Sequence, residues 1–263
     1  MSKYADAIRL VRNSVGAFRD PVERRRRRIS FDLARKLDFT VQVGPLKGFR
    51  VAQNPSWGRG DLAGMLLGLY EAPVLSKLVE LSEKFCAFID IGAADGYYGV
   101  GLVKSDIYQT SYCFEMSSRS QRSLAALAAE VGVVDRVKIA GRADSGLVVD
   151  ALNALGDGGG AAILIDIEGG EYDLLNSETL FKLAGCAIIV EMHDVGPQTA
   201  IFELELKAHA EPWFIVSQLK SAGKNPHALE QLQSLSETDK WLICSEARSR
   251  SQHWLIFEPR SLA

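Results

Sequence analysis

The chain has 263 residues, enough for one large domain or for a domain with an extension. With 47% hydrophobic and 24% charged residues, its composition is that of a soluble globular protein with a sizeable core. The formal net charge of −3 favours neither nucleic acid nor a membrane as a partner, and no apolar run has the length of a membrane span or the form of a signal peptide.

Charged residues and cysteines are unevenly placed. Residues 1–40 hold eleven Lys and Arg against five Asp and Glu, so the remainder of the chain is acidic. Cysteines stand at positions 86, 113, 186 and 244 without the C-x-x-C spacing of a zinc or redox site. We therefore expect buried thiols in a reducing, cytoplasmic setting, and no zinc.

The first 84 residues predict a helical extension that includes a small hairpin. Residues 4–18 have the apolar stripe of a helix, and Pro21 suits the first turn of a second helix that carries five consecutive arginines, 24–28. Such a basic run is either a solvated face or an arm for an anionic substrate. The two N-terminal helices also offer a surface for an oligomer.

Between that helix and residue 84, we expect a hairpin from residues 39–43 and 49–52, then a loop over 54–61. Asp61 is placed to cap a short helix that ends at Leu69, and residues 74–84 predict a further amphipathic helix. Residues 1–84 are accordingly interpreted as an extension and lid, and residues 85–263 as the main domain.

From residue 85, strand and helix patterns alternate. The predicted strands are 85–91, 111–115, 137–140, 162–167 and 187–192, and the predicted helices are 97–103, 119–131, 146–155 and 172–183. Nearly continuous apolar strands of this kind favour an α/β fold with a doubly wound, mostly parallel sheet. Residues 213–219 and 253–257 flank a polar insertion and predict an antiparallel hairpin at the sheet edge.

The turn after the first of these strands organises the prediction. It reads Asp90-x-Gly92-x-x-x-Gly96, with a second acid at Asp95. A pyrophosphate site has the spacing G-x-G-x-x-G, and two carboxylates would repel a pyrophosphate. Carboxylates suit a ligand that carries an ammonium group and ribose hydroxyls, as S-adenosylmethionine does. The alternative is a strand–turn–helix unit without a ligand.

Acids or a histidine recur where the predicted strands end. They are Asp90, Glu115, Asp166 with Glu168, and Glu191 with His193. Because the carboxyl ends of parallel strands share one edge of a sheet, and ligands bind outside that edge, these side chains indicate one site. Independent solvated strand ends are the alternative.

Three motifs, in this order and spacing, resemble one known family. Residues 67–71 contain Gly-x-Tyr-Glu, residues 166–171 contain Asp-x-Glu-Gly-x-Glu, and residues 191–193 read Glu-x-His. Together they resemble the FkbM-type S-adenosylmethionine-dependent methyltransferases over residues 85–194. Ala94-Asp95 departs from the Ala-Asn that is common in that family.

The resemblance implies a class I methyltransferase-like, Rossmann-like sheet of seven strands, the last antiparallel. It also implies methyl transfer to a hydroxyl, most often of a sugar or another small molecule. Glu115 would accept the ribose hydroxyls and Asp144 the adenine amino group. Carried over by position, the cofactor-binding residues would be Asp90, Gly92, Ala93, Asp95, Gly96, Glu115, Met116, Asp144 and Asp166.

The reaction requires a base beside the acceptor oxygen. His193, with an ordinary pKa near neutrality, is the first candidate, and Asp166 and Glu191 follow. A divalent ion held by Asp166, Glu168, Glu191 and His193 is a further possibility, which the motif does not require, so we predict no metal site.

The acceptor pocket would be lined by the strand ends and by the lead-in segment, which we define as residues 37–71. Its predicted residues are Trp57, Arg59, Tyr70, Glu71 and Glu168. Two other functions fit the sequence: a non-catalytic module that binds S-adenosylmethionine, and a nicotinamide-dependent oxidoreductase, which the turn spacing disfavours.

Overall fold

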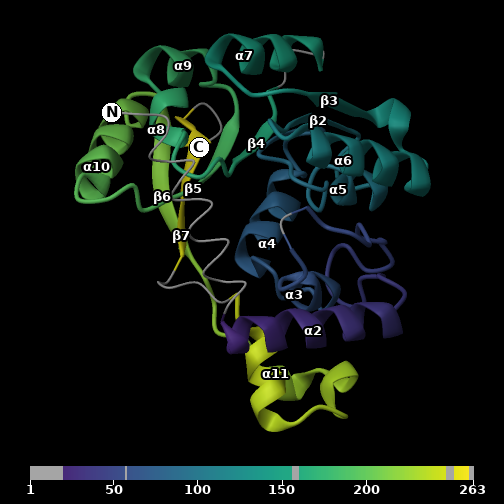
Figure 1. Ribbon diagram of the computed structural model, residues 1–263. Helices are drawn as coiled ribbons and strands as arrows, with labels where there is room; N and C mark the ends of the chain where they lie inside the picture. The colour runs from purple at the N-terminus through teal and green to yellow at the C-terminus, as the bar shows by residue number, and fades with distance from the viewer. Residues whose placement is uncertain (1–19, 57, 156–159, 247–251, 261–263) are drawn as a thin grey trace.

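The computed structural model describes residues 20–56, 58–155, 160–246 and 252–260 (Figure 1). They contain one seven-stranded sheet in the order β3-β2-β1-β4-β5-β7-β6. The strands are β1 Ala87–Ile91, β2 Thr110–Phe114, β3 Val137–Ala140, β4 Ala162–Ile165, β5 Ala187–Glu191, β6 Phe214–Lys220 and β7 His253–Pro259. Strands β1 to β5 pair in parallel, whereas β7 is antiparallel to both β5 and β6. The predicted doubly wound, mostly parallel sheet of seven strands and its antiparallel edge hairpin are confirmed.

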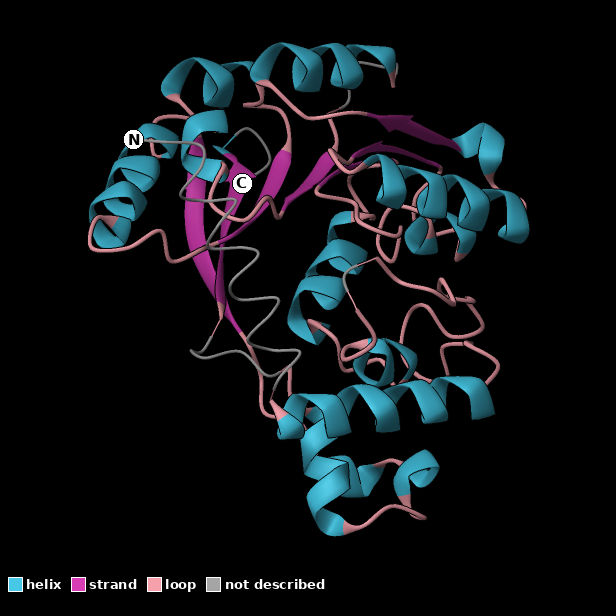
Figure 2. Ribbon diagram, in the orientation of Figure 1, coloured by secondary structure: helices cyan, strands magenta, loops and turns pink. Residues whose placement is uncertain are grey.

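Helices cover both faces of the sheet (Figure 2). They are α2 Pro21–Lys36, α3 Leu62–Leu66, α4 Ala72–Leu81, α5 Gly101–Lys104, α6 Ser118–Val131, α7 Ser145–Ala154, α8 Glu171–Leu174, α9 Ser177–Lys182, α10 Thr199–Ala210 and α11 Glu237–Cys244. Successive side chains of a strand point to opposite faces. Leu164 thus packs with the layer of α4, α5 and α6, and Ile163 and Ile165 pack with the layer of α7 to α10.

Several predicted helices differ from those observed. The helix expected over 97–103 begins only at Gly101, and the turn that precedes it is correspondingly longer. The helix expected over 172–183 is two short helices, because the side chain of Asn176 caps α9 by accepting the N–H of Thr179. Helix α10 and the helices of the polar insertion were not predicted.

The lead-in segment also departs from the prediction. The two segments of the expected hairpin meet at one antiparallel bridge between Thr40 and Arg50, where Val41 donates to the carbonyl of Phe49 and Val51 to that of Phe39. Asp61 precedes α3, but its side chain makes no capping hydrogen bond. The helix predicted over residues 4–18 lies outside the described residues.

A small apolar cluster joins the N-terminal helices to the insertion between β6 and β7. Leu33 of α2 and Leu67 after α3 pack with Ile243 of α11 (Figure 1). Much of the basic run of α2 serves this junction. Arg25 pairs with Asp239 of α11, and Arg26 pairs with Asp61 of the lead-in segment. Arg26 and Arg27 also pair with Glu23 of the same helix. The arginine run is therefore largely engaged within the protein.

Two composition-based expectations can be compared with the structure. All four cysteines are free; Cys113, Cys186 and Cys244 are buried as expected, whereas Cys86 is exposed, so the expectation of buried thiols is wrong for it. Within the described ranges, no helix combines the length and apolar character that crossing a membrane requires.

The side chain of Arg26 should contribute to stability through this junction. It is 4% exposed, pairs with Asp61 and Glu23, and donates to the carbonyl of Ser245. Arg26→Met leaves Asp61 without its cation and the carbonyl of Ser245 without its donor, while Glu23 keeps Arg27. The free energy of unfolding should therefore fall by about 2 kcal/mol, less than for a fully buried pair because Asp61 is partly exposed. Urea unfolding measures this change. The matched control Arg25→Met removes only an exposed pair and should leave stability unchanged; equal losses in both variants would contradict the account.

Candidate functional site

The turn after β1 lies against the end of β4. Gly92 has φ +97°, and a Cβ atom placed there would lie 1.8 Å from the carbonyl oxygen of Asp166. Gly96 also has positive φ, as predicted, and so does Ala94 (φ 46°). At position 92, only glycine permits both the positive φ and the close approach to the carbonyl of Asp166. The turn that we expected to bind the ligand and the Asp166 strand end are thus built as one unit.

Asp90, within β1, supports this turn through a hydrogen bond to its backbone. Its side chain is buried, and its Oδ2 accepts the N–H of Gly99 at 2.8 Å. Burial, partly offset by that hydrogen bond and increased by the nearby charge of Glu115, raises the pKa of Asp90 to about 7. Asp90 is not among the side chains that line the neighbouring cavity, so its contact is with the turn backbone.

Glu115 connects the same turn to the end of β2. It is 5% exposed; its Oε2 accepts the N–H of Ala94 at 2.9 Å, and its Oε1 accepts the N–H of Ser117 at 2.7 Å. A carboxylate has lone pairs for further donors, so both oxygens can still accept from a ligand. Glu115 therefore holds the turn in place at the position where a ribose was predicted.

Asp95 ties the lead-in loop to the turn. Its Oδ2 accepts both the N–H (2.6 Å) and the hydroxyl (2.9 Å) of Ser56. The hydroxyl of Ser120, on α6, donates to Ser56 in turn. The other carboxylate oxygen, Oδ1, is buried and has no hydrogen-bond partner in the described part of the chain. A buried acceptor in this state is open to a donor from an ordered water or from a ligand.

A cavity of about 330 Å³ opens beside the turn, at the carboxyl edge of the sheet. Its lining residues come from the lead-in segment, the turn, the strand ends and the insertion: Val51, Ala52, Pro55, Gly58, Asp61, Leu62, Met65, Tyr70, Ala94, Asp95, Tyr97, Tyr98, Leu127, Asp166, Glu168, Glu191 and Glu246. Residues of the lead-in segment thus share this cavity with the strand ends. Tyr70 and Glu168, both predicted for the acceptor pocket, are among its lining residues.

Other predicted site residues lie elsewhere. The guanidinium of Arg59 stacks 3.7 Å over the ring of Phe31, so the prediction that it faces the pocket is wrong. Asp144 is exposed and caps α7 by accepting the N–H of Leu147. The side chain of Met116 is 76% exposed. Trp57 lies outside the described residues.

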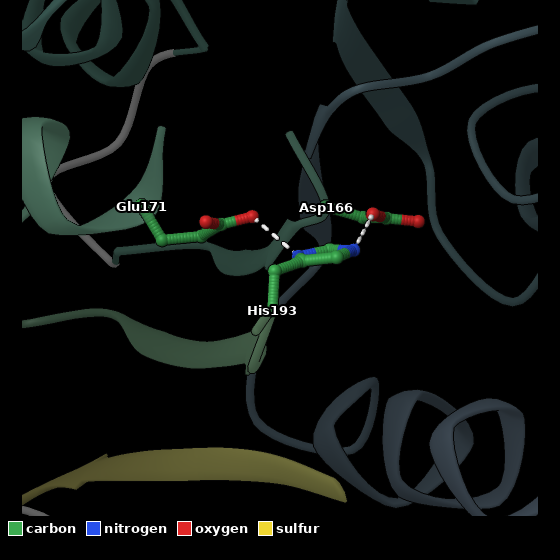
Figure 3. Close-up of side chains that lie close together, drawn as sticks. All are labelled: Asp166, Glu171 and His193. Carbon is green, nitrogen blue, oxygen red and sulfur yellow. Dashed lines mark hydrogen bonds and ion pairs between the residues drawn. The ribbon is translucent and has the colours of Figure 1, made fainter. Parts of the chain in front are cut away.

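The strand ends bring His193 between acids (Figure 3). Its Nδ1 lies 2.9 Å from Oε1 of Glu171, a fully buried carboxylate that also accepts the N–H of Ile167. Its Nε2 lies 3.5 Å from Oδ1 of Asp166, and 3.7 Å from carboxylate oxygens of Glu168 and Glu191. The bond to Glu171 fixes the orientation of the ring, so Nε2 faces three acids from two strand ends.

These neighbours change the proton affinities within the cluster. Burial lowers the pKa of His193, but the hydrogen bond to Glu171 and the charges of Glu171, Asp166 and Glu191 outweigh it and raise the pKa to about 9. The expectation of a near-neutral histidine is therefore wrong, because an imidazolium between acids keeps its proton. Asp166 is 35% exposed, yet the surrounding protein and the charge of Glu71 raise its pKa well above the ordinary range.

Asp166 also belongs to two groups of possible cation ligands. Its carboxylate lies within 4.8 Å of ligand atoms of Glu171 and His193, and within the same distance of carboxylate oxygens of Glu71 and Glu191. The first group is already held together by the direct contact between Glu171 and His193. The second consists of oxygen ligands, which suit a hard divalent ion or an organic cation equally.

Sequence reasoning missed several residues of this region. Glu171 stood in the quoted motif without a role, although its spacing from Asp166 was visible. Tyr98, whose hydroxyl donates to Glu71 at 3.0 Å, lay in a segment interpreted as helix. Glu246 reaches the cavity from the insertion, where no motif marked it.

No family model matches the chain, and no curated protein matches its sequence. Solved structures resemble its arrangement of strands and helices. The B. subtilis M1A22 tRNA methyltransferase TrmK is 13% identical, with 70% of this chain and 64% of that chain covered and a TM-score of 0.44. The O-methyltransferase from Bacillus cereus, in complex with SAH, is 14% identical, with 74% and 90% covered and a TM-score of 0.46. The M. capricolum TrmK, in complex with S-adenosyl-homocysteine, is 12% identical, with 71% and 68% covered and a TM-score of 0.41. This chain spans less than two thirds of the B. subtilis protein.

The raised pKa of Asp90 predicts a pH-dependent stability. Between its ordinary value of 3.8 and about 7, the folded state binds the Asp90 proton more tightly than the unfolded state does. The free energy of unfolding should therefore fall as pH rises through this window, by at most about 1.4 kcal/mol per pH unit. Asp90→Asn keeps an oxygen for Gly99 and removes the titration, so the variant should gain stability relative to wild type between pH 4 and pH 8.

Urea midpoints at the two pH values measure this difference. Asp135→Asn, which changes an exposed aspartate, is the matched control and should follow the wild-type curve. A stability difference between Asp90→Asn and wild type that is the same at pH 4 and pH 8 would contradict the assignment.

Proposed function

We propose that this chain is an S-adenosylmethionine-dependent methyltransferase of the FkbM type, which methylates a hydroxyl of a small molecule such as a sugar. The observation that carries the proposal is the joining of two features at one sheet edge: a glycine turn held by Glu115, and an acid-lined cavity that begins at Asp166. Ligands of open α/β sheets bind at this edge.

The residues present fit this cofactor. The unpartnered Oδ1 of Asp95 is an acceptor for the ammonium or hydroxyl donors that S-adenosylmethionine carries. Glu115 accepts the ribose hydroxyls beside the backbone of Gly92, Ala93 and Gly96, and the exposed side chain of Met116, next in the chain, contacts the outer edge of the cofactor. Asp144 has one carboxylate oxygen engaged as a helix cap and the other available to the adenine amino group. When bound, the cofactor supplies a methyl group on a cationic sulfonium, whose sulfur leaves readily as a neutral thioether when the methyl group is transferred.

The chain's own contribution is to orient the acceptor and remove its proton. Alignment of the acceptor oxygen lowers much of the barrier. Asp166 and Glu191 line the cavity, whereas His193 does not, so we assign proton removal to Asp166. His193, fixed by Glu171, keeps a positive charge beside Asp166 and orients its carboxylate. This replaces the histidine base expected from the sequence.

The remaining proposals follow from this assignment. Residues 1–84 serve as extension and lid, since their loops reach the cavity and the turn. The acceptor is a small molecule rather than a nucleic acid, and no metal ion is required. The N-terminal helices remain a candidate surface for an oligomer, and the cytoplasm the proposed compartment.

Cofactor binding is tested through Glu115. Glu115→Ala removes charge-assisted hydrogen bonds to the ribose, so affinity for S-adenosylhomocysteine should weaken by about 1–3 kcal/mol in calorimetry. Glu130→Ala, on the exposed side of the adjacent helix, is the matched control and should bind as wild type does. Undiminished affinity in Glu115→Ala would remove Glu115 from the site. A nicotinamide cofactor that binds in place of S-adenosylhomocysteine would favour the oxidoreductase.

Turnover is tested with S-adenosylmethionine that carries a tritiated methyl group, added to fractions of an extract of the source cells. Label should enter the low-molecular-weight fraction and not the RNA fraction. Asp166→Asn should lower labelling by roughly 10² to 10⁴, the usual contribution of a positioned base. Because the deprotonated carboxylate is the active form and its pKa is raised, the wild-type rate should rise with pH towards neutrality.

Asp173→Asn changes an exposed acid next to the same motif and should label as wild type does. Loss of labelling with EDTA, restored by Mg²⁺, would assign proton removal to a bound ion. Tight binding of S-adenosylhomocysteine without labelling of any fraction would instead support the non-catalytic module.

A further inference from the structure

Tyr97 combines burial with an unsatisfied polar group. Its side chain is 8% exposed, and its hydroxyl oxygen is buried without a hydrogen-bond partner among the residues that the structure describes. Leaving a buried hydroxyl in this state costs free energy that the phenylalanine of the same shape would not cost. The presence of tyrosine at this position is therefore explained by a bound ligand that supplies a hydrogen-bond partner for its hydroxyl.

The position of Tyr97 identifies where that partner sits. Tyr97 forms part of the cavity wall, directly after the cofactor turn. Its ring makes edge contacts with Tyr70 (centroids 5.6 Å apart, 90°) and Tyr98 (5.0 Å, 72°). Two such contacts hold the ring in one orientation. Tyr70 and Tyr98 line the same cavity, so the Tyr97 ring is held within its wall by two neighbours from that wall.

The hydroxyl stays protonated at any physiological pH. Burial, and next the charge of Glu71, raise the pKa of Tyr97 far above its usual range. It is therefore a hydrogen-bond donor with lone pairs that also accept. A partner that satisfies both capacities of the Tyr97 hydroxyl must accept one hydrogen bond and donate another, as a hydroxyl does.

The cavity also limits the charge of this partner. Asp95, Asp166 and Glu168 line it, and neither Lys nor Arg is among the described residues of its wall. Close like charges are strongly unfavourable where water is excluded. A phosphate group, whether of a metabolite or of a nucleic acid, would meet these carboxylates, whereas a neutral or cationic polyol would not.

We propose that the Tyr97 hydroxyl is the contact that binds the acceptor, and that the acceptor is a hydroxyl-bearing molecule without phosphate. This assignment rests on the proposed methyltransferase function and specifies its substrate class. Tyr97 donates to a hydroxyl of the acceptor and thereby holds the reacting oxygen at a fixed place relative to Asp166 and the cofactor. Such positioning lowers the barrier without any change in cofactor affinity.

Tyr97→Phe tests this assignment, with Tyr108→Phe as the matched control. The hydroxyl of Tyr108 is also buried, but it donates to the carbonyl of Leu78 at 2.7 Å and does not line the cavity. In the ligand-free protein, Tyr97→Phe should have a urea midpoint equal to or above wild type, because it removes an unsatisfied group. Tyr108→Phe should have a lower midpoint, because it leaves a carbonyl without its donor.

Function should change in the opposite sense. Labelling of the low-molecular-weight fraction by tritiated S-adenosylmethionine should fall about tenfold or more in Tyr97→Phe, as expected for one lost hydrogen bond. It should be unchanged in Tyr108→Phe. Calorimetry with S-adenosylhomocysteine should give the wild-type dissociation constant for both variants.

The outcomes separate this assignment from the function on which it rests. Wild-type labelling in a Tyr97→Phe variant that folds normally would overturn the assignment and leave the function standing. Weakened binding of S-adenosylhomocysteine would place Tyr97 on the cofactor and also overturn it. A labelled product that carries phosphate would overturn the substrate class. A wild-type protein that labels no fraction would contradict the proposed function and this assignment with it.

Discussion

The close approach of Gly92 to the carbonyl of Asp166 is the constraint on which the site depends. A side chain at position 92 would collide with that carbonyl, and the backbone there has positive φ. Glycine thus lets the turn after β1 lie directly against the end of β4. Glu115 and Asp90 then fix the turn from two sides through the N–H groups of Ala94 and Gly99. The turn after β1 and the acidic strand ends therefore have one fixed relative position.

Hydrogen bonds from the lead-in segment complete this arrangement. Ser56 donates twice to Asp95, and Glu71 accepts the hydroxyl of Tyr98. Beside this segment, α2 and α3 pack with α11 from the insertion, so segments distant in the sequence share one apolar cluster. The imidazolium of His193 is stabilised by the acids around it. The pKa of Asp166 is raised first by burial and then by the charge of Glu71 at the same sheet edge.

The sequence predicted those parts that local patterns determine. Apolar strands, the glycine turn and the acids at strand ends were all visible, because parallel topology brings strand ends together whatever the loops do. Side-chain partners were less accessible. Arg59 stacks on Phe31 and Asp61 pairs with Arg26, and neither contact has a signal in sequence spacing. The pKa of His193 depends on Glu171, Asp166 and Glu191 together, so its charge state required the three-dimensional cluster.

Hydrogen–deuterium exchange with and without S-adenosylhomocysteine tests the central claim most directly, since it reports on the backbone of the turn itself. Because the account places the cofactor on the turn after β1, peptides that cover residues 92–99 and 115–118 should exchange more slowly when the compound is present. Peptides from α10, on the far layer of the sheet, should exchange at the same rate in both samples. Unchanged exchange at residues 92–99 under saturating S-adenosylhomocysteine, or protection confined to other segments, would contradict the account.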